Sequence, residues 1–330
     1  MTRDSKSLRV LVGGATGYIG RHVVQSLLAH GHQVIALMRD DPARPDADAV
    51  DRALAGAMRA DWDDLSGAGP VDVVISCIAS RTGVAADAWH VDHGLNQRLL
   101  DAAHAAGARR FVLLSAICVQ KPRLAFQFAK LEFEKALADS GLEYAIVRPT
   151  AYFKSLAGQV SRVQNGKPFL VFGNGALTAC RPISAADLAD FIAHHASTRD
   201  AANAVLPIGG PGPAITPREQ GEMLFELSGR PPRFRRVPPA MFRIAHAVLR
   251  PLGVVFPRLK AKAELARIGH YYATESMLLW DAAAQRYAAD DTPSYGSDTL
   301  REFYADALRN GLGGHELGAQ RVFDRKRARD

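Results

Sequence analysis

The feature that most limits how this chain can fold is a glycine-rich turn directly after a short apolar run. The apolar residues Leu8 to Val12 lead into Gly14-Ala15-Thr16-Gly17-Tyr18-Ile19-Gly20. Glycine has no Cβ, so the chain can turn sharply there and phosphates can approach its backbone. The N–H groups at the start of a following helix attract anions. We therefore predict that these seven residues bind the pyrophosphate of a dinucleotide.

The residues after this turn complete a strand-helix-strand unit. Apolar side chains recur at helical spacing from Ile19 to Leu28, Gly31 ends the pattern, and a second apolar run follows from Val34 to Leu37. Three glycines can also form an ordinary surface turn. The ordered context of strand, turn, helix and strand favours the nucleotide-binding interpretation.

Strand and helix patterns continue to alternate through the first half of the chain. Strands are predicted over 72–78, 110–115 and 144–149, and helices over 94–106 and 126–140. Near-continuous apolar strands indicate a parallel sheet that is covered on both faces. We predict an α/β protein with a Rossmann-type doubly wound parallel sheet, in which residues 1–155 bind the cofactor. Ligands in such sheets bind beyond the carboxyl ends of the strands, where we place the cofactor-binding residues Ala79, Ser115 and Pro149.

Beyond Pro149 the alternation weakens, and turn residues become more frequent. We predict a smaller, mixed α+β substrate-binding portion over 156–310, with a hairpin over 167–182. The run 204–208 is a strand that can rejoin the main sheet. A capping box begins a helix at Thr216. Residues 311–330 are expected to form a flexible charged tail.

The end of the second strand indicates which nicotinamide cofactor is bound. An acidic residue there would hydrogen-bond the ribose of NAD, whereas a basic residue would bind the 2′-phosphate of NADPH. Arg39 stands at this position, which favours NADPH, although a solvated surface arginine is the alternative. Asp61, just past the short third strand, is either a partner of the adenine amino group or a turn residue.

Composition restricts the compartment and the kind of site. Three widely spaced cysteines, Cys77, Cys118 and Cys180, fit neither a disulfide framework nor a zinc site, so we expect no metal ligands and a cytoplasmic location. The polar N-terminus leads straight into the first strand, and no signal peptide is expected. No apolar run approaches the roughly 20 residues of a spanning helix.

Positive charge is concentrated in residues 230–270. This segment contains ten Lys or Arg residues and a single acid, Glu264, in a chain whose net charge is +7. Interleaved apolar residues suggest amphipathic helices that contact an anionic membrane surface or guide an acidic, apolar substrate. Helices that pack on the core with solvated arginines outside are the alternative. No recognised nucleic-acid-binding motif accompanies the charge, and we expect no nucleic-acid partner.

The predicted chemistry centres on Lys130. Its position on the helix after Ser115 resembles the catalytic lysine of the short-chain dehydrogenase/reductase superfamily, in its extended or atypical branch. That superfamily has a tyrosine four residues before the lysine, where this chain has Phe126. Without the phenol, a proton relay to a carbonyl or alcohol is missing, which disfavours alcohol oxidation and sugar epimerisation. Lys130 is expected to hold the nicotinamide ribose and is our first proton-donor candidate, with a surface lysine as the alternative.

A bound NADPH can still reduce a conjugated carbon–carbon double bond, because the π-system of the acceptor takes up the negative charge. Five sequence blocks, at 115–130, 147–155, 166–173, 206–217 and 266–277, resemble the family of NADPH-dependent divinyl chlorophyllide a 8-vinyl reductases. The resemblance runs from about Leu8 to Tyr304. It implies a tetrapyrrole substrate, 3,8-divinyl (proto)chlorophyllide a, whose 8-vinyl group becomes ethyl in (bacterio)chlorophyll biosynthesis.

A tetrapyrrole substrate suggests roles for several further residues. Tyr152 is our second proton-donor candidate, and Tyr271 and Tyr272 are more remote ones. Each aromatic residue can equally be a packing residue. The full set of expected substrate-binding residues is Phe126, Tyr152, Phe153, Lys154, Arg181, Tyr271 and Tyr272. Of these, Phe153 is also expected at the cofactor, and the two cations can pair with the propionate of the pigment or remain solvated.

Two other functions remain open at this point. One is a double-bond reductase of the isoflavone-reductase kind, which shares the lysine and lacks the tyrosine. The other is a non-catalytic NADP(H)-binding redox sensor that acts through a protein partner. The sequence does not distinguish chlorophyllide from protochlorophyllide, and it does not give the oligomeric state.

Overall fold

A seven-stranded parallel sheet forms the centre of the computed structural model, which describes residues 7–38, 46–62, 69–198, 200 and 202–312. The strand order is β3-β2-β1-β4-β5-β6-β8, so the order reverses between β1 and β4, where doubly wound sheets bind their ligands. The predicted fold class is confirmed. The strands are β1 Arg9–Gly13, β2 Gln33–Met38, β3 Met58–Asp61, β4 Val73–Ser76, β5 Arg110–Leu114, β6 Glu143–Pro149 and β8 Ala204–Ile208.

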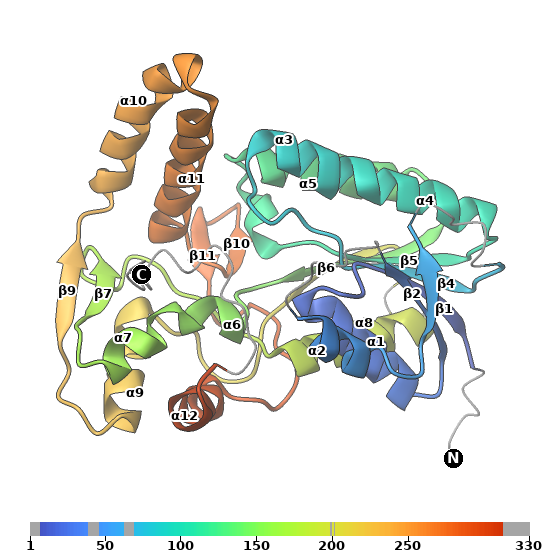
Figure 1. Ribbon diagram of the computed structural model, residues 1–330, viewed down its shortest axis with the longest axis horizontal. Helices are drawn as coiled ribbons and strands as arrows, with labels where there is room; N and C mark the ends of the chain where they lie inside the picture. Colours follow the sequence, from blue (N-terminus) through green and yellow to red (C-terminus); the bar gives the residue numbers. More distant parts are fainter. Residues whose placement is uncertain (1–6, 39–45, 63–68, 199, 201, 313–330) are drawn as a thin grey trace.

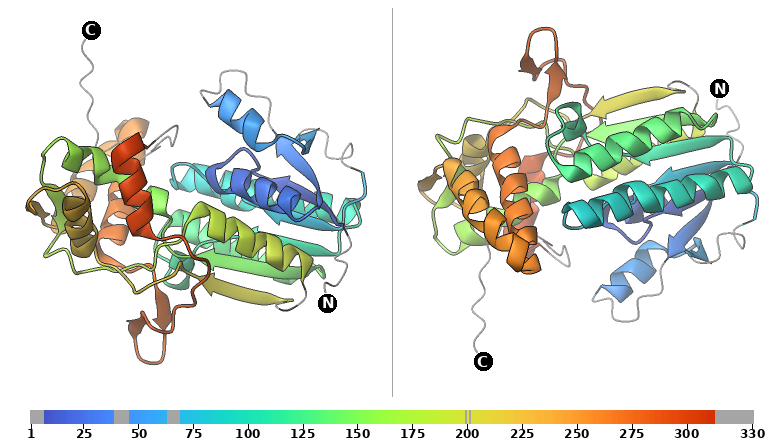
Figure 2. Two further views of the ribbon diagram at one scale, coloured as in Figure 1. Left: turned by 90° about the horizontal axis from the view of Figure 1, so that it is seen from below. Right: turned by 90° about the horizontal axis from the view of Figure 1, so that it is seen from above.

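Helices cover both faces of this sheet (Figures 1 and 2). Alternate side chains of a strand enter opposite layers: Val10 and Val12 pack in one buried cluster, and Leu11 packs in the other. Because both faces are buried, the strands are apolar without interruption. One layer contains α1 Tyr18–Ala29, α2 Ala47–Ala53 and α8 Ala185–Ser197, and the other contains α3 Ala85–Ala88, α4 Asn96–Ala105 and α5 Ala125–Ala138.

A second lobe has its own apolar core, formed by segments that lie far apart in the sequence. It contains α6 Phe153–Leu156, α7 Val160–Gln164, β7 Phe169–Phe172, α9 Pro217–Leu227, β9 Phe234–Val237 and α12 Leu300–Asn310. The predicted hairpin over 167–182 is wrong, because β7 pairs in parallel with β9. The rings of Phe169 and Phe234 stack edge to face across this pair, 6.1 Å apart, and join the core.

Two other predictions for this half of the chain are confirmed. Strand β8 rejoins the main sheet by pairing in parallel with β6. Helix α9 begins with a capping box, in which the Thr216 side chain accepts from the Glu219 N–H and the Glu219 carboxylate accepts from the Thr216 N–H.

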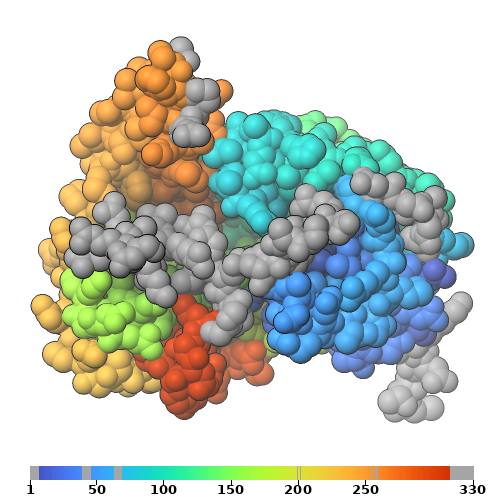
Figure 3. Space-filling model, viewed as in Figure 1, coloured from blue at the N-terminus to red at the C-terminus, as the bar shows by residue number. Residues whose placement is uncertain are grey.

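The basic segment begins with strand β9, and the helices predicted for its apolar part form a hairpin, α10 Ala240–Val255 and α11 Pro257–Thr274. The hairpin projects from the body of the protein (Figures 1 and 3). Two glycines permit the close packing of its helices: a Cβ on Gly269 would lie 2.6 Å from the Phe242 ring, and one on Gly253 would lie 2.9 Å from the Lys260 backbone. A small two-stranded sheet, β10 Leu279–Asp281 with β11 Arg286–Ala288, follows the hairpin.

None of the helices in the described part of the chain is both long and apolar enough to cross a bilayer. Two predictions fall outside the described residues: the role of Arg39 and the flexible tail, of which only residues 311 and 312 are described.

Candidate functional site

The glycine turn between β1 and α1 has the shape of a phosphate cradle. Gly14 has φ +73°, and its carbonyl accepts from the Gly17 N–H at 2.9 Å. A Cβ on Gly20 would lie 2.1 Å from the Gly14 oxygen, so only glycine fits there without a backbone shift. Gly17 precedes α1 without a side-chain cap, and the first turn of α1 has no acidic residue. The positive end of the α1 dipole therefore lies beside a turn in which Gly17 is exposed.

Lys130, on α5, forms a buried ion pair with an aspartate that the sequence analysis missed. The Lys130 Nζ lies 2.9 Å from Oδ1 of Asp92, and these side chains are 10% and 1% exposed. The same Oδ1 accepts from the Ser80 N–H at 3.2 Å. The other carboxylate oxygen, Oδ2, is buried and has no hydrogen-bond partner within the described residues. The lysine ammonium is thus fixed at the carboxyl end of the sheet.

Asp92 lies on a π-helical turn, Trp89–Leu95, that leads into α4. The Asn96 amide donates to the carbonyl oxygens of Asp92 and Val91, at 3.0 and 3.3 Å, and its own oxygen accepts from the Ser76 hydroxyl. This network ties the π-turn to the end of β4. Because π-helical turns often occur at functional sites, the position of this turn beside Lys130 supports a functional site there. Neither this turn nor the ion pair could be predicted from the sequence.

The other predicted cofactor residues lie at the expected edge, with one difference. Ala79 is exposed just after β4, and Pro149 is buried at the end of β6. The Ser115 hydroxyl, in contrast, donates to the Glu134 carboxylate, which also binds Arg148. The Ser115 side chain is therefore held within the sheet-helix interface and is not directed at a ligand.

Three groups from different elements gather near Lys130. They are the Cys118 thiol, which follows β5, the Tyr152 phenol, which precedes α6, and the Tyr272 phenol, which comes from α11. Cys118 lies within the electrostatic reach of Lys130 and within hydrogen-bonding reach of Tyr272. Desolvation raises the pKa of both phenols, and the next largest cause is Cys77 at Tyr152 and Cys118 at Tyr272. Tyr272 nonetheless keeps 47% of its surface accessible, so it is open to a ligand.

The structure separates Tyr271 from Tyr272. The Tyr271 hydroxyl donates to the backbone carbonyls of Cys118 and Lys121, at 3.0 and 3.2 Å, and its side chain is buried. Desolvation raises the pKa of Tyr271 to about 12. Tyr271 thus ties α11 to the nucleotide-binding lobe and has no surface for a substrate. Phe126 packs in the same seam, so the position that lacks the catalytic phenol is filled by an apolar contact between the lobes.

Two further residues that were predicted to bind substrate have contacts within the protein. The Arg181 guanidinium donates from Nε to the backbone carbonyl of Gly212, at 2.8 Å, and from Nη1 to that of Thr292, so two loops hold it in place. The Phe153 ring is buried in the core of the second lobe, 5.6 Å from the Phe303 ring. Its side chain does not face the cofactor or a substrate.

The remaining predicted residues are placed as follows. The Lys154 ammonium lies 4.5 Å from the centre of the Tyr18 ring, at the start of α1. Desolvation raises the pKa of Tyr18 to about 12. Asp61 is the last residue of β3 and is exposed, next to the end of β2 in the register of the sheet. Asp61 thus lies on the β2–β3 side of the switch point, where the adenosine half of a dinucleotide would bind, whereas Lys154 follows β6 on the other half of the sheet.

Comparison with known proteins agrees with this site. Residues 14–199 match the model of an NAD(P)H-binding protein family. The chain is 51% identical to the chloroplastic divinyl chlorophyllide a 8-vinyl-reductase of Oryza sativa subsp. indica, over 95% of this chain and 82% of that protein. It is 46% identical to the Arabidopsis thaliana protein of the same name, over 96% and 81% of the two chains.

Among solved structures, the NADPH complex of an NADPH-dependent quinone oxidoreductase from Escherichia coli superposes with a TM-score of 0.64. It is 22% identical and covers 91% of this chain and 99% of its own, which shows the shared fold. The identities to the two plant proteins, which extend over nearly the whole chain, are far more specific. The chain therefore belongs to the divinyl chlorophyllide a 8-vinyl-reductase family of NAD(P)H-binding oxidoreductases.

Proposed function

We propose that this protein reduces the C8 vinyl group of 3,8-divinyl (proto)chlorophyllide a to an ethyl group, with NADPH as the hydride donor. Membership of the reductase family supports the reaction. The observation that carries it is the state of the catalytic helix, where Lys130 is kept and paired with Asp92 while Phe126 is buried at the position of the usual phenol. This arrangement suits an acceptor that stabilises its own negative charge.

The glycine cradle fits a dinucleotide, since a Cβ would fill the space at Gly20 and collide at Gly14. We assign the pyrophosphate to the turn Gly14 to Gly20, the nicotinamide ribose to Lys130, and the 2′-phosphate to Arg39. Residues 1–155 would then bind the cofactor, and residues 156–310 would bind the substrate. The exceptions are α8, which packs against the main sheet, and β8, which is one of its strands. When bound, NADPH supplies the hydride.

The second lobe offers a hollow for the pigment next to Tyr272. This cavity has a volume of about 240 Å³, and its walls include Tyr272, Leu156, Phe169 and Phe172. Aromatic and aliphatic walls suit one edge of a planar, apolar macrocycle. The hollow is smaller than a tetrapyrrole, so most of the ring would lie between the lobes.

The reaction balances when one vinyl carbon receives a hydride and the other receives a proton, which together convert vinyl to ethyl. The macrocycle delocalises the charge between these two events. Tyr152 and Tyr272 both have a raised pKa and keep their protons at neutral pH, so either can give one to a strongly basic carbanion. The Lys130 ammonium, our first candidate from the sequence, is the other possible donor, and solvent would restore the proton afterwards.

The test is an absorption assay of the purified protein with divinyl pigment and either NADPH or NADH. Loss of vinyl conjugation should shift the Soret band to the blue. Arg39→Ala should lose the preference for NADPH, and Lys130→Ala should reduce turnover. No spectral change with any divinyl pigment would overturn the proposal. Equal binding of both cofactor oxidation states without turnover would instead support the redox-sensor alternative.

We also propose that the basic segment brings the protein against the anionic surface of the photosynthetic membrane as a peripheral contact. Exposed apolar residues on α10, such as Ile244 and Val248, together with the surrounding arginines, support this contact. Sedimentation with vesicles that contain phosphatidylglycerol should be strong at low salt and weak at high salt. Vesicles of phosphatidylcholine alone should leave the protein in the supernatant.

A further inference from the structure

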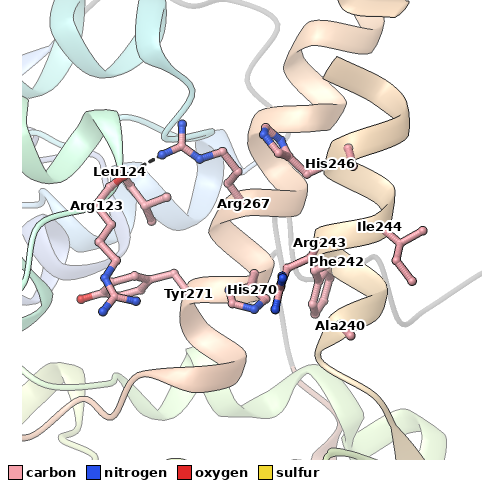
Figure 4. A pocket seen from close by; sticks show the side chains of 11 residues that line it. Arg123, Leu124, Ala240, Phe242, Arg243, Ile244, His246, Arg267, His270 and Tyr271 are labelled. Atoms are coloured by element: carbon pink, nitrogen blue, oxygen red, sulfur yellow. Dashed lines mark hydrogen bonds between the residues drawn. The ribbon is translucent and has the colours of Figure 1, made fainter. Parts of the chain in front are cut away.

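A cavity of about 620 Å³ lies at the base of the α10–α11 hairpin, apart from the glycine turn and from Lys130. Figure 4 shows its side chains, which come from α10, from α11 and from the residues just before α5. The cationic and imidazole groups in its lining are Arg123, Arg243, Arg267, His246 and His270, and no carboxylate is among the lining residues. We propose that this cavity binds the phosphate headgroup of one anionic phospholipid. The inference rests on the membrane contact proposed above.

Two of the possible hydrogen-bond donors in the cavity lining are available to a ligand. The side chain of Arg243 is exposed, and neither it nor the His270 ring has a hydrogen-bond or ion-pair partner within the described residues. His246, in contrast, already has a partner: its Nδ1 lies 3.0 Å from the Ala263 carbonyl oxygen, which can only accept, so Nδ1 carries the proton and donates it there. A planar guanidinium that is free to form two parallel hydrogen bonds is the side chain best suited to a phosphate.

The other two arginines make the cavity rigid. The Arg123 guanidinium lies 3.0 Å from the Glu275 carboxylate, and Arg267 donates to the Arg123 carbonyl oxygen at 2.9 Å. These contacts fix the wall between α11 and the nucleotide-binding lobe. The guanidinium of Arg267 still adds positive potential, because its contact is to a neutral carbonyl.

An apolar stripe adjoins the cavity. Met241, Ile244, Val248 and Leu252 recur at helical spacing on α10 and are 52%, 65%, 56% and 45% exposed. Ile244 also lines the cavity, so the stripe and the cavity share this residue. A cationic pocket that opens onto an exposed apolar stripe matches an amphiphile whose anionic group lies next to acyl chains.

Charge favours a lipid over a protein as the occupant. The only acid between residues 230 and 270 is Glu264, and its carboxylate accepts from the Ala85 N–H at 2.7 Å, facing α3. A second copy of this chain, with its net charge of +7, would be repelled. A uniformly basic surface around an apolar stripe is complementary to a bilayer that contains acidic lipids.

The test measures binding of short-chain, monomeric phosphatidylglycerol to the full-length protein by calorimetry, with the matching phosphatidylcholine and inorganic phosphate as comparison ligands. Arg243→Ala should weaken binding of phosphatidylglycerol at least about tenfold, as expected for the loss of a charge-assisted hydrogen bond. The control is Arg250→Ala, which removes the same charge from an exposed position of the same helix outside the cavity. The control should change the affinity less than about twofold, in keeping with a solvated charge.

Ala247→Glu gives a second variant, since it places a carboxylate on the cavity wall at an exposed helical position, and it should abolish binding. Equal losses in Arg243→Ala and Arg250→Ala would overturn the headgroup site while leaving a diffuse membrane contact in place. Equal affinity for inorganic phosphate would overturn the lipid assignment. Competition between the divinyl pigment and phosphatidylglycerol would also overturn the lipid assignment, because the cavity would then bind the carboxylate of the pigment. If the protein does not sediment with vesicles, the membrane contact itself is refuted. Vinyl reduction is measured in lipid-free solution, so it tests the proposed reaction independently of lipid binding.

Discussion

The buried pair between Lys130 and Asp92 leads to the prediction that the structure defines best. Asp92→Asn keeps the size of the side chain and removes its charge. The lysine ammonium is then left almost fully buried, because these side chains are only 10% and 1% exposed. Removing one partner from a buried ion pair costs about 3–5 kcal/mol. We expect the free energy of unfolding to fall by about 3 kcal/mol, since the backbone N–H of Ser80 can still bind the amide oxygen.

Helix α5 also provides the matched control. Lys135 and Asp139 form an exposed pair at 2.6 Å, with side chains 72% and 66% exposed. Asp139→Asn should cost no more than about 0.5 kcal/mol. Urea denaturation at neutral pH, followed by circular dichroism, measures the change in the free energy of unfolding for both variants. The double variant Asp92→Asn, Lys130→Met should recover part of the loss, because neither buried charge remains.

The same substitution tests the functional role of the pair. If Asp92 holds the ammonium in place, Asp92→Asn should weaken NADPH binding and lower kcat, whereas Asp139→Asn should leave both unchanged. The reasoning is refuted if Asp92→Asn and Asp139→Asn have the same effect on stability. In that case Lys130 is solvated and its position does not depend on the π-turn.

Three further predictions concern other parts of the molecule. Gly20→Ala should abolish NADPH binding in a fluorescence titration, since its Cβ would lie 2.1 Å from a backbone oxygen, whereas Gly94→Ala, with its nearest atom at 3.5 Å, should bind normally. Tyr272→Phe should lower kcat at least about tenfold, the low end for loss of a general acid, without changing stability; Tyr271→Phe should instead lower stability by about 1–2 kcal/mol through lost buried hydrogen bonds. Hydrogen bonds from the capping box lower the pKa of Glu219 in the folded protein. The carboxylate therefore contributes its full share to the free energy of unfolding above the unfolded-state pKa of about 4.3, and this share is lost as the pH falls through the lower, folded-state pKa. Glu219→Gln should therefore cost about 0.5–1 kcal/mol at pH 7, with a difference from wild type that narrows below about pH 4 in thermal melts.

Local patterns in the sequence were sufficient for the nucleotide-binding lobe. The strands β1, β2, β4, β5 and β6 are apolar runs bounded by turns, so their patterns locate them, whereas the short, exposed β3 has no such run. The glycine turn was found because its function depends on residues next to one another in the chain. The second lobe was harder to predict, because β7 pairs with β9 across α8, β8 and α9, and no local pattern records a pairing over that distance.

The site shows the same division between local and long-range information. Sequence reasoning found Lys130 from its place after β5, yet its partner Asp92 lies on a different helix. It could not choose between Tyr271 and Tyr272, since one residue is a rotation of about 100° around a helix and only packing decides which side faces the core. It also assigned Arg181 to a substrate, although backbone carbonyls of two loops bind the guanidinium.

These observations connect the loss of the usual phenol with the way the lobes are joined. Phe126 lies in the apolar seam where Tyr271 and Ile268 of α11 meet the nucleotide-binding lobe, and a tyrosine there would bring a hydroxyl into a buried cluster. The same helix presents Tyr272, one residue further along, to the region beside Cys118 and Lys130. An apolar residue at 126 thus strengthens the contact that positions α11, and α11 in turn brings a phenol to the site from the other lobe. If this is correct, Phe126→Tyr should not create alcohol dehydrogenase activity, and it should reduce vinyl reduction by loosening the seam.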